Sequence, residues 1–261
     1  MCRLLAYLGP AIALDRLISE PPHSLVVQSY APREMTSGTL NADGFGFAWY
    51  DFARQPAPFV YRNILPIWSD TNLPSLGRYV ISDCMLAYVR SATPGQSLDF
   101  SNTQPFHADG LSLLHNGFVE DFHATLLRLI RESLDEDAYA MIRGTTDSEH
   151  LFGWLAHHVR AASTLGAGLS AGLAALIALA PDARMTLNFI VSDGRAIVAS
   201  RLARGATPPS LYWLSGHARF PGATLIASEP LFEDDAWQPC PDGSVISIEG
   251  DHDIRIEPVP V

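Results

Sequence analysis

The sequence predicts an α+β fold, because segments typical of strands lie in the first and last parts of the chain and segments typical of helices lie between them. Short apolar runs bounded by glycine or proline come first. Apolar residues spaced three and four positions apart begin after Asp121, and strand-like runs return after Ala180. The two strand-rich blocks can pair as one sheet or as two. Since no internal repeat divides the chain, we expect one domain over residues 1–261.

The first block contains four candidate strands, of which three are short and mostly apolar, as buried strands are. These three are CRLLAYL (Cys2–Leu8), FGFAWYDF (Phe45–Phe52) and CMLAYVRSA (Cys84–Ala92). The fourth, LSLLHN, runs from Leu111 into the dipeptide Asn116-Gly117, which favours a tight turn with positive backbone φ. We therefore expect the chain to reverse direction there. The proline-rich patches Pro56–Pro58 and Pro208–Pro209 are expected to be loops.

The middle of the chain predicts two or three consecutive helices. The segment FHATLLRLIRESL (Phe122–Leu134) has helical spacing, and the next segment begins with Thr146 as a candidate N-cap and Glu149 three residues later. A third apolar segment, Thr164–Ala180, is shorter than the ~20 residues that a membrane span needs, so we expect a core helix.

The last block predicts a hairpin and four further strands. The hairpin turns at Asp193-Gly194. The segments are LNFIVSDGRAIVAS (187–200), LYWLS (211–215), ATLIAS (223–228), SVISIEG (244–250) and HDIRIEP (252–258).

Composition limits the classes of partner. The 261 residues are 48% hydrophobic, which leaves ample material for a buried core. Lys and Arg number 17 against 28 Asp and Glu, and the resulting formal net charge of -11 repels nucleic-acid phosphates and anionic lipid. We therefore expect neither nucleic acid nor a membrane as partner. The oligomeric state stays open, a homo-oligomer included.

The beginning of the chain has an apolar run that an export signal would also have. Gly9-Pro10 interrupts this run and Asp15-Arg16 closes it early, so we expect no signal peptide. The chain has three cysteines, an odd number without metal-ligand spacing. This predicts neither a disulfide framework nor a zinc site, and it favours a cytoplasmic location.

Cys2 is a candidate nucleophile because of its position next to the initiator methionine. A lone cysteine near a terminus usually has no function. Once Met1 is removed, however, the α-amino group of Cys2 lies within a few bonds of its thiol. The amine has an ordinary pKa of about 7.7 to 8.0 and the thiol one of about 8.5, so the amine can accept the thiol proton and later return it to a leaving group.

Five pieces of the sequence together resemble the class II glutamine amidotransferases, which are N-terminal-nucleophile hydrolases. In chain order they are Cys2, RSATPG (Arg90–Gly95), NTQPF (Asn102–Phe106), LLHNG (Leu113–Gly117) and TDSE (Thr146–Glu149). The resemblance spans most of the chain. It implies a four-layer αββα sandwich of two mainly antiparallel sheets, in a single domain that begins at Cys2 after removal of Met1. It implies no cofactor.

The resemblance also implies the chemistry of the site. Cys2 would attack the side-chain amide carbon of a γ-glutamyl group. The side-chain amide of Asn116 and the backbone N–H of Gly117 would form the oxyanion hole, which agrees with the expectation that a tight turn aims fixed donors at one point.

Three further residues would bind the substrate. Arg90 matches the arginine that holds the substrate α-carboxylate, and Asp147 matches the acid that holds the α-ammonium. Thr93 would line the same pocket. Without the family pattern, Arg90 reads as a surface charge and Asp147 as a helix cap. The sequence departs from some synthase glutaminases at Pro94, where those have a histidine.

Three segments point to a narrower group, the stand-alone amidohydrolases of ergothioneine biosynthesis, which remove glutamate from γ-glutamyl-hercynylcysteine sulfoxide. They are SEPPHSLVVQSYAPR (19–33), NADGFGFAWY (41–50) and IASEPL (226–231). The second of these lacks the spacing of a dinucleotide-binding loop and reads as a glycine-rich strand entry. A synthase would need a second domain to consume the ammonia, but the motifs and the following strands occupy the 261 residues, which favours a free-standing hydrolase. A glutaminase subunit that feeds ammonia to a separate synthase, and a γ-glutamyl sensor without turnover, are the alternatives.

Other reactive side chains are expected to have ordinary roles. His150, His157 and His158 form no recognised metal-ligand set, so we expect no metal. Cys84 and Cys240 lack a basic sequence neighbour and are expected to be inert. Aromatic residues are candidates for contact with a trimethylammonium group on the leaving amine, or for the core. They are Tyr30, Trp49, Tyr50 and Trp68.

Overall fold

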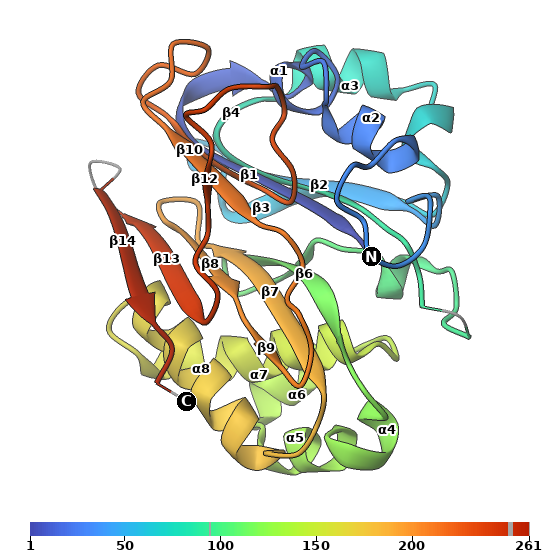
Figure 1. Ribbon diagram of the computed structural model, residues 1–261, viewed down its shortest axis with the longest axis vertical. Coiled ribbons are helices and arrows are strands. Elements are labelled where there is room, and N and C mark those ends of the chain that lie inside the picture. The colour runs from blue at the N-terminus through green and yellow to red at the C-terminus, as the bar shows by residue number, and fades with distance from the viewer. Residues whose placement is uncertain (94, 250–252, 261) are drawn as a thin grey trace.

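The computed structural model describes residues 1–93, 95–249 and 253–260, and it contains two seven-stranded sheets that face each other (Figure 1). All strand pairs in the described residues are antiparallel. Helices cover the outer face of each sheet. The α+β class and the four-layer αββα sandwich are therefore confirmed.

The first sheet combines strands from the beginning of the chain with strands from residues 212–239, because β1 lies between β4 and β11. Its strands, in spatial order, are β12 (Gln238–Pro239), β10 (Tyr212–Ser215), β11 (Thr224–Ala227), β1 (Arg3–Ala13), β4 (Ile81–Val89), β2 (Phe45–Asp51) and β3 (Gln55–Asn63).

The second sheet is formed by the middle and the end of the chain. Its strands, in spatial order, are β14 (Asp253–Pro258), β13 (Ser244–Glu249), β8 (Ile197–Arg201), β7 (Met185–Ser192), β6 (Leu111–Val119) and β5 (Phe106–Ala108), with the short β9 (Ala203–Arg204) paired to β7.

Two groups of helices form the outer layers (Figure 1). Those on the first sheet are α1 (Asp15–Ile18), α2 (Leu25–Tyr30), the 3₁₀ turn η1 (Ile67–Ser69) and α3 (Leu73–Tyr79). Those on the second sheet are α4 (Phe122–Thr125), α5 (Leu127–Ser133), α6 (Glu136–Ala140), α7 (Asp147–Ala161) and α8 (Leu165–Leu179). A second 3₁₀ turn, η2 (Phe100–Asn102), precedes β5.

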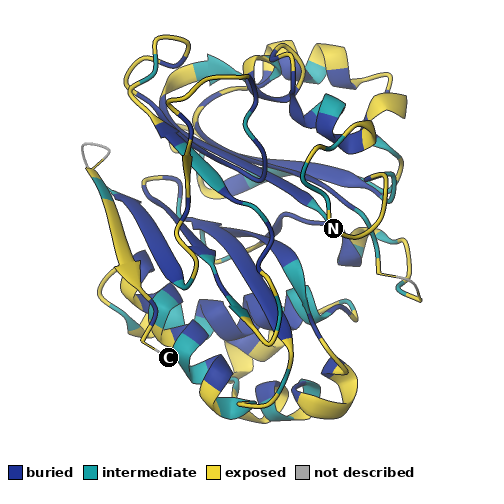
Figure 2. Ribbon diagram, in the orientation of Figure 1, coloured by how far each residue is buried: buried dark blue, intermediate teal, exposed yellow. Residues whose placement is uncertain are grey.

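Three apolar clusters correspond to the three interfaces of this sandwich. One lies between the first sheet and its helices and another between the second sheet and its helices. The third, which we call the inter-sheet core, includes Leu4 and Leu86 from the first sheet and Leu114 and Ile190 from the second. In Figure 2 the strands are mostly buried, and the helices that cover them have both buried and exposed residues. Residues that alternate along a strand thus serve two different cores.

Most of the predicted elements are confirmed. Helix α7 begins after Thr146, whose side chain accepts a hydrogen bond from Glu149 N–H. Helix α8 is a core helix, and the hairpin between β7 and β8 turns at Gly194 with φ of 85°. The single helix predicted from Phe122 is instead two, α4 and α5, which meet at Leu126. The predicted ends at residues 250 and 252 lie outside the described residues.

Two predictions based on proline are wrong. Gly9-Pro10 does not end the first strand, because β1 continues to Ala13 with a shift of register between Leu8 and Ile12. Pro56–Pro58 is not a loop but part of β3, at the edge of the first sheet. Proline lacks the N–H that a central strand needs, but an edge strand and an irregular register tolerate it. Pro208–Pro209 is a loop, as predicted.

The predicted turn at Asn116-Gly117 is also wrong. Both residues lie within β6, opposite Asn188 and Leu187 of β7, and the chain turns only at Asp121, whose φ is 50°. Glycine is needed at position 117 for a different reason: a Cβ atom there would lie 1.9 Å from Thr186 O. The close approach of β7, and not a positive φ, excludes a side chain at this position.

Candidate active site

Cys2 lies where the two sheets meet. It precedes β1 of the first sheet, and its backbone N–H donates a hydrogen bond to Oδ1 of Asn116 on β6 of the second, at 3.0 Å. Its Sγ lies 3.1 Å from Tyr88 Oη and 3.6 Å from Ser91 O, and the residue is half-buried. The structure thus brings the predicted nucleophile and the predicted oxyanion asparagine into direct contact.

Met1 is present before Cys2, so the Cys2 nitrogen is an amide in this structure. The Met1 amino group donates to Ser37 O at 2.9 Å, and Thr36 Oγ1 donates to the Met1 sulfur at 2.7 Å. Burial lowers the pKa of this amino group below its ordinary value. The segment before β2 therefore covers the start of the chain.

The edge of β6 carries the second half of the site. His115 N–H donates to Gln104 Oε1 at 2.6 Å, and Val119 N–H donates to Asp147 Oδ2 at 3.1 Å. Alternate residues of a strand point their N–H groups to the same edge. The N–H of Gly117 therefore points between these two capped positions. Beside it, the Nδ2 of Asn116 is buried and has no hydrogen-bond partner in the described residues.

His115 fixes the position of this strand and is neutral. Burial lowers its pKa below the ordinary value of 6.5. Its Nε2 lies 3.3 Å from Thr186 O, which only accepts, so Nε2 carries the hydrogen and Nδ1 accepts from Ser148 Oγ at 2.9 Å. The ring also stacks on Phe189, with a centroid distance of 4.3 Å. His115 thereby connects β6 to the start of α7.

Arg90 directly follows β4 and is 2% exposed. Among the residues that the structure describes, its guanidinium has hydrogen bonds only to the next loop, at Ser97 O (3.3 Å) and Gln96 Oε1 (3.4 Å). None of the ion pairs in the described residues includes Arg90. A buried guanidinium without a carboxylate is suited to bind one from a ligand.

The glycine-rich entry to β2 supports this arginine. Arg90 N–H donates to Gly44 O, and the Asp43 carboxylate accepts from Ala92 N–H at 2.8 Å. Phe45 begins β2, so the segment is a strand entry, as predicted, and not a nucleotide loop.

Asp147 is the first residue of α7 and faces the same region. Its carboxylate accepts from Val119 N–H and, at 2.8 Å, from Ser148 N–H. Asn102 connects the segment before α7 to the loop after Arg90. Its Nδ2 donates to Ser97 Oγ, and its Oδ1 accepts from Thr145 N–H. One side chain therefore joins the loop that contacts Arg90 to the segment just before Asp147.

Thr93 is less closely connected to the rest of the site. It lies on the loop after Arg90, its side chain is exposed, and its carbonyl accepts from Gln96 N–H at 3.0 Å. Its role in lining the pocket stays a prediction. Pro94, at which the sequence departs from some relatives, lies outside the described residues.

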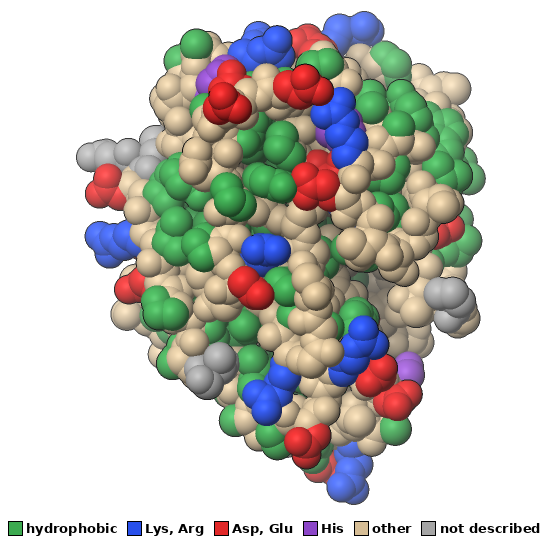
Figure 3. All heavy atoms as spheres, in the orientation of Figure 1, with side chains coloured by type: hydrophobic (Ala, Val, Ile, Leu, Met, Phe, Trp, Pro, Cys, Tyr) green, Lys and Arg blue, Asp and Glu red, His purple; other side chains and the backbone are tan. Residues whose placement is uncertain are grey.

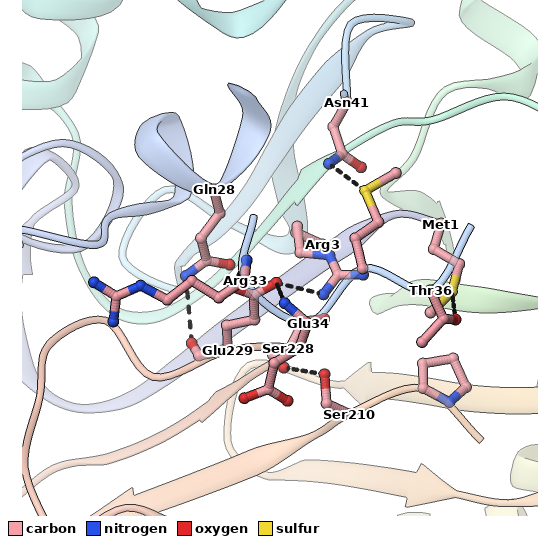
Figure 4. A network of polar contacts seen from close by, with 12 residues as sticks. Met1, Arg3, Gln28, Arg33, Glu34, Thr36, Asn41, Ser210, Ser228 and Glu229 are labelled. Carbon is pink, nitrogen blue, oxygen red and sulfur yellow. Dashed lines mark hydrogen bonds and ion pairs between the residues drawn. The ribbon is translucent and has the colours of Figure 1, made fainter. Parts of the chain in front are cut away.

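A buried polar network, which we call the Glu229 network, holds β1 where it begins, directly after Cys2 (Figure 4). Glu229 accepts from Arg3 Nη1 at 2.8 Å and contacts His23 Nε2 at 2.7 Å, with all three side chains at most 4% exposed. It also accepts from the backbone N–H groups of Arg33 and Glu34. Burial alone raises the pKa of Glu229, but the bonds from His23 and both N–H groups, with the charge of Arg3, lower it below the ordinary value.

The other candidate residues have structural surroundings. Cys84 and Cys240 are free and buried, and burial raises the pKa of each thiol to about 12. The charge of Arg201 near Cys240 opposes this only partly, so Cys240 has a basic neighbour in space that is absent from its sequence neighbours. His150 contacts Thr146 O and Arg131, and no group of three metal-ligating side chains occurs among the described residues.

The four candidate aromatic residues divide into two pairs. The Tyr50 hydroxyl is buried and bonds to Ser112 and Ser192, and Trp49 stacks on Phe59. Tyr30 and Trp68 instead form an edge-to-face pair that is about half exposed, with 6.0 Å between centroids. On the face in Figure 3, acidic and basic side chains are interspersed, so the negative net charge forms no single patch there. None of the described helices has the length and apolarity to cross a membrane.

Comparison with known proteins decides the family. The family model of the class II glutamine amidotransferases matches residues 1–257. The chain is a class II glutamine amidotransferase. Two similar family members are the γ-glutamyl-hercynylcysteine sulfoxide hydrolases of Mycobacterium tuberculosis (strain CDC 1551 / Oshkosh), 34% identical over 95% of this chain and 93% of that protein, and of Mycolicibacterium smegmatis, 32% identical over 97% of each.

A solved structure agrees with this class II glutamine amidotransferase fold. The class II glutamine aminotransferase domain protein of Silicibacter pomeroyi superposes with a TM-score of 0.72 at 25% identity, covering 98% of this chain and 99% of that one. The resemblance that the five sequence motifs indicated is thus confirmed for the family and for the fold.

Several residues of this amidotransferase site could not be identified from the sequence. Tyr88, Asn102 and Glu229 have partners far away in the chain, for example 86 residues between Cys2 and Tyr88 and 226 between Arg3 and Glu229, and Gln104 bonds to the backbone of His115, 11 residues away. The motif NTQPF contained two of them, but gave no indication of what they bind.

Proposed function

We propose that this protein hydrolyses a γ-glutamyl amide bond through a thioester on Cys2. After loss of Met1, the α-amino group takes the thiol proton and the sulfur attacks the amide carbon. The C–N bond breaks as the ammonium returns the proton to the leaving amine, and water then releases glutamate from the thioester. The contact between the Cys2 nitrogen and Asn116 Oδ1 carries this proposal, because it places the base, the nucleophile and an amide donor together.

The oxyanion of each tetrahedral intermediate would be stabilised by Asn116 and Gly117. Asn116 Oδ1 is occupied by Cys2, so its amide is oriented and the unpartnered Nδ2 is available as a donor. The Gly117 N–H lies on the edge of β6 to which the N–H groups of His115 and Val119 also point. Removal of one such donor costs on the order of 10² to 10³ in rate.

Arg90 and Asp147 would recognise the amino-acid end of the substrate. Arg90 offers a buried guanidinium to the α-carboxylate, and Asp147 offers a carboxylate to the α-ammonium. Asp147→Ala is expected to raise KM about tenfold or more with a smaller change in kcat, since the ammonium loses its counter-ion. Steady-state kinetics of glutamate release measure this, and Asp193→Ala, in the distant hairpin turn, is the control. An unchanged KM would remove Asp147 from the pocket.

For the substrate, we propose γ-glutamyl-hercynylcysteine sulfoxide, with the reaction in the cytoplasm. The names of the mycobacterial relatives support this substrate. Within the chain, two of the segments that suggested the narrower group meet in the Glu229 network, through His23 and Glu229. The exposed pair Tyr30 and Trp68 is available to a cationic leaving group.

The test compares glutamate release from γ-glutamyl-hercynylcysteine sulfoxide with release from glutamine. We expect a much higher kcat/KM for the sulfoxide. Equal or better use of glutamine would contradict this substrate and favour a glutaminase subunit, whose turnover a partner synthase would stimulate. Binding of both compounds without release of glutamate, and no adduct of a diazo-ketone glutamine analogue on Cys2, would favour a sensor and contradict hydrolysis.

A further inference from the structure

The phenol of Tyr88 touches the sulfur of Cys2 from a rigid part of the fold. The residue is 2% exposed and belongs to the inter-sheet core. It lies on β4, a central strand, where it pairs with Leu4 of β1 on one side and with Gly46 of β2 on the other. The hydroxyl 3.1 Å from Cys2 Sγ is therefore held in place by two neighbouring strands.

The partners of this pair decide which atom donates. Ser91 O, 3.6 Å from Cys2 Sγ, only accepts, so it is the acceptor for the thiol hydrogen. In residues 1–93, 95–249 and 253–260, the Tyr88 hydroxyl has Cys2 Sγ as its one hydrogen-bond partner. A buried hydroxyl without an acceptor is costly, so the Tyr88 O–H donates to the sulfur.

The phenol keeps its hydrogen at neutral pH. Burial, with a smaller contribution from the neighbouring Cys2, raises the pKa of Tyr88 well above its ordinary value. The sulfur thus faces a donor that does not compete for its proton.

We propose that Tyr88 is a catalytic residue, which stabilises negative charge on the Cys2 sulfur by donating a hydrogen bond to it. This role rests on the proposed function. Before attack, the thiol proton is on the α-amine and the sulfur is a thiolate. In the last step, water adds to the thioester, the C–S bond breaks and its electron pair returns to sulfur, which then regains a proton. Tyr88 holds the thiolate at both points and is itself never deprotonated.

The charged groups around the pair come from four segments. They are Arg90 after β4, Asp147 on α7, Asp43 before β2 and Arg3 on β1, together with the α-amino group. All of them stay in place in Tyr88→Phe, which removes only the hydroxyl. A difference between wild type and this variant therefore reports the hydrogen bond to sulfur.

The direct test is the pH dependence of alkylation. Mature protein without Met1 is treated with iodoacetamide, and the adduct on the N-terminal peptide is followed by mass spectrometry. We expect the midpoint of the rate profile of Tyr88→Phe to lie about one pH unit above that of wild type, because the thiolate loses a donor. We also expect kcat/KM at neutral pH to fall about tenfold. Coincident alkylation profiles would overturn the proposal.

The control is Tyr50→Phe, which removes a second buried hydroxyl from the same inter-sheet core, at a position that does not touch Cys2. Its alkylation profile should match wild type. If Tyr88→Phe does not fold, 3-fluorotyrosine at position 88 retains the shape and is a stronger donor, so it should move the midpoint to lower pH. No movement would overturn the proposal. Since alkylation needs no substrate, this result is independent of whether the chain hydrolyses γ-glutamyl amides.

Discussion

The two sheets hold their halves of the site by different kinds of interaction. The first sheet, which carries Cys2, is fixed beside the site by a buried ion pair between Arg3 and Glu229, and His23 contacts the same carboxylate. The second sheet, which carries Asn116, is fixed by neutral groups, since Gln104 caps both the N–H and the C=O of His115. Removing one member of a buried ion pair leaves an unpaired charge and costs much of the free energy of unfolding. Removing one partner of a neutral hydrogen bond costs less.

The largest expected effect is on catalysis alone, with both sheets left in place. Cys2→Ala should reduce glutamate release to background, because no other group supplies the nucleophile, while the melting temperature stays close to wild type. Cys240→Ser, which replaces another buried cysteine at nearly constant volume, is the control and should remain active. Substantial hydrolysis by Cys2→Ala would contradict covalent catalysis.

The next largest effect is expected when the ion pair beside the first half of the site is removed. Glu229→Gln leaves Arg3 buried without a counter-ion, so we expect a loss of about 3–5 kcal/mol in the free energy of unfolding. Denaturant unfolding measures it. Glu233→Gln is the matched control, because Glu233 pairs with Arg33 at the surface and its loss should cost less than about 1 kcal/mol. Similar costs for the two variants would contradict the importance of the Glu229 network.

A smaller effect is expected when the neutral hydrogen bonds to β6 are removed. Gln104→Ala leaves the N–H and C=O of His115 without their partner, and we expect a loss of about 1–3 kcal/mol in the free energy of unfolding. Gln238→Ala, an exposed glutamine on β12, should change it by about 0.5 kcal/mol or less. A greater loss in Gln104→Ala than in Glu229→Gln would reverse the comparison between the two sheets.

The smallest effect concerns pH. His115 has a lowered pKa in the folded protein, so between the ordinary value of 6.5 and this lower one the unfolded chain binds a proton that the folded chain does not. Stability should therefore fall as pH falls from about 7 to about 5. Thermal unfolding over this range should show a weaker pH dependence in His115→Asn than in wild type. An equal dependence would mean that His115 does not contribute.

The sequence was sufficient to predict those parts of the fold and site that depend on local pattern. Apolar runs identified β1, β2 and β4, and Thr146 with Glu149 located the start of α7. The dipeptide Asn116-Gly117 was misread as a turn, because a glycine required by the closeness of Thr186 O looks the same in sequence as one required by positive φ.

The parts that could not be predicted depend on distant pairings. The prolines of β3 concealed a strand, because only its position at the sheet edge makes them acceptable. Tyr88 is an ordinary strand residue until β1 places Cys2 beside it. Sequence reasoning assigned roles to Cys2, Asn116, Gly117, Arg90, Asp147 and Thr93 by resemblance, and their roles in the reaction stay proposals.

The inter-sheet core has a consequence for how this protein tolerates change. The nucleophile and the amide that faces it belong to different sheets, and the apolar side chains between the sheets set the spacing of the two. A volume change at Leu114 or Ile226 would alter this spacing, and so would change turnover as well as stability. Substitutions beneath the outer helices would change stability without altering the spacing of the two sheets. Efforts to evolve new substrates should therefore leave the middle of the sandwich untouched and vary the loops around it.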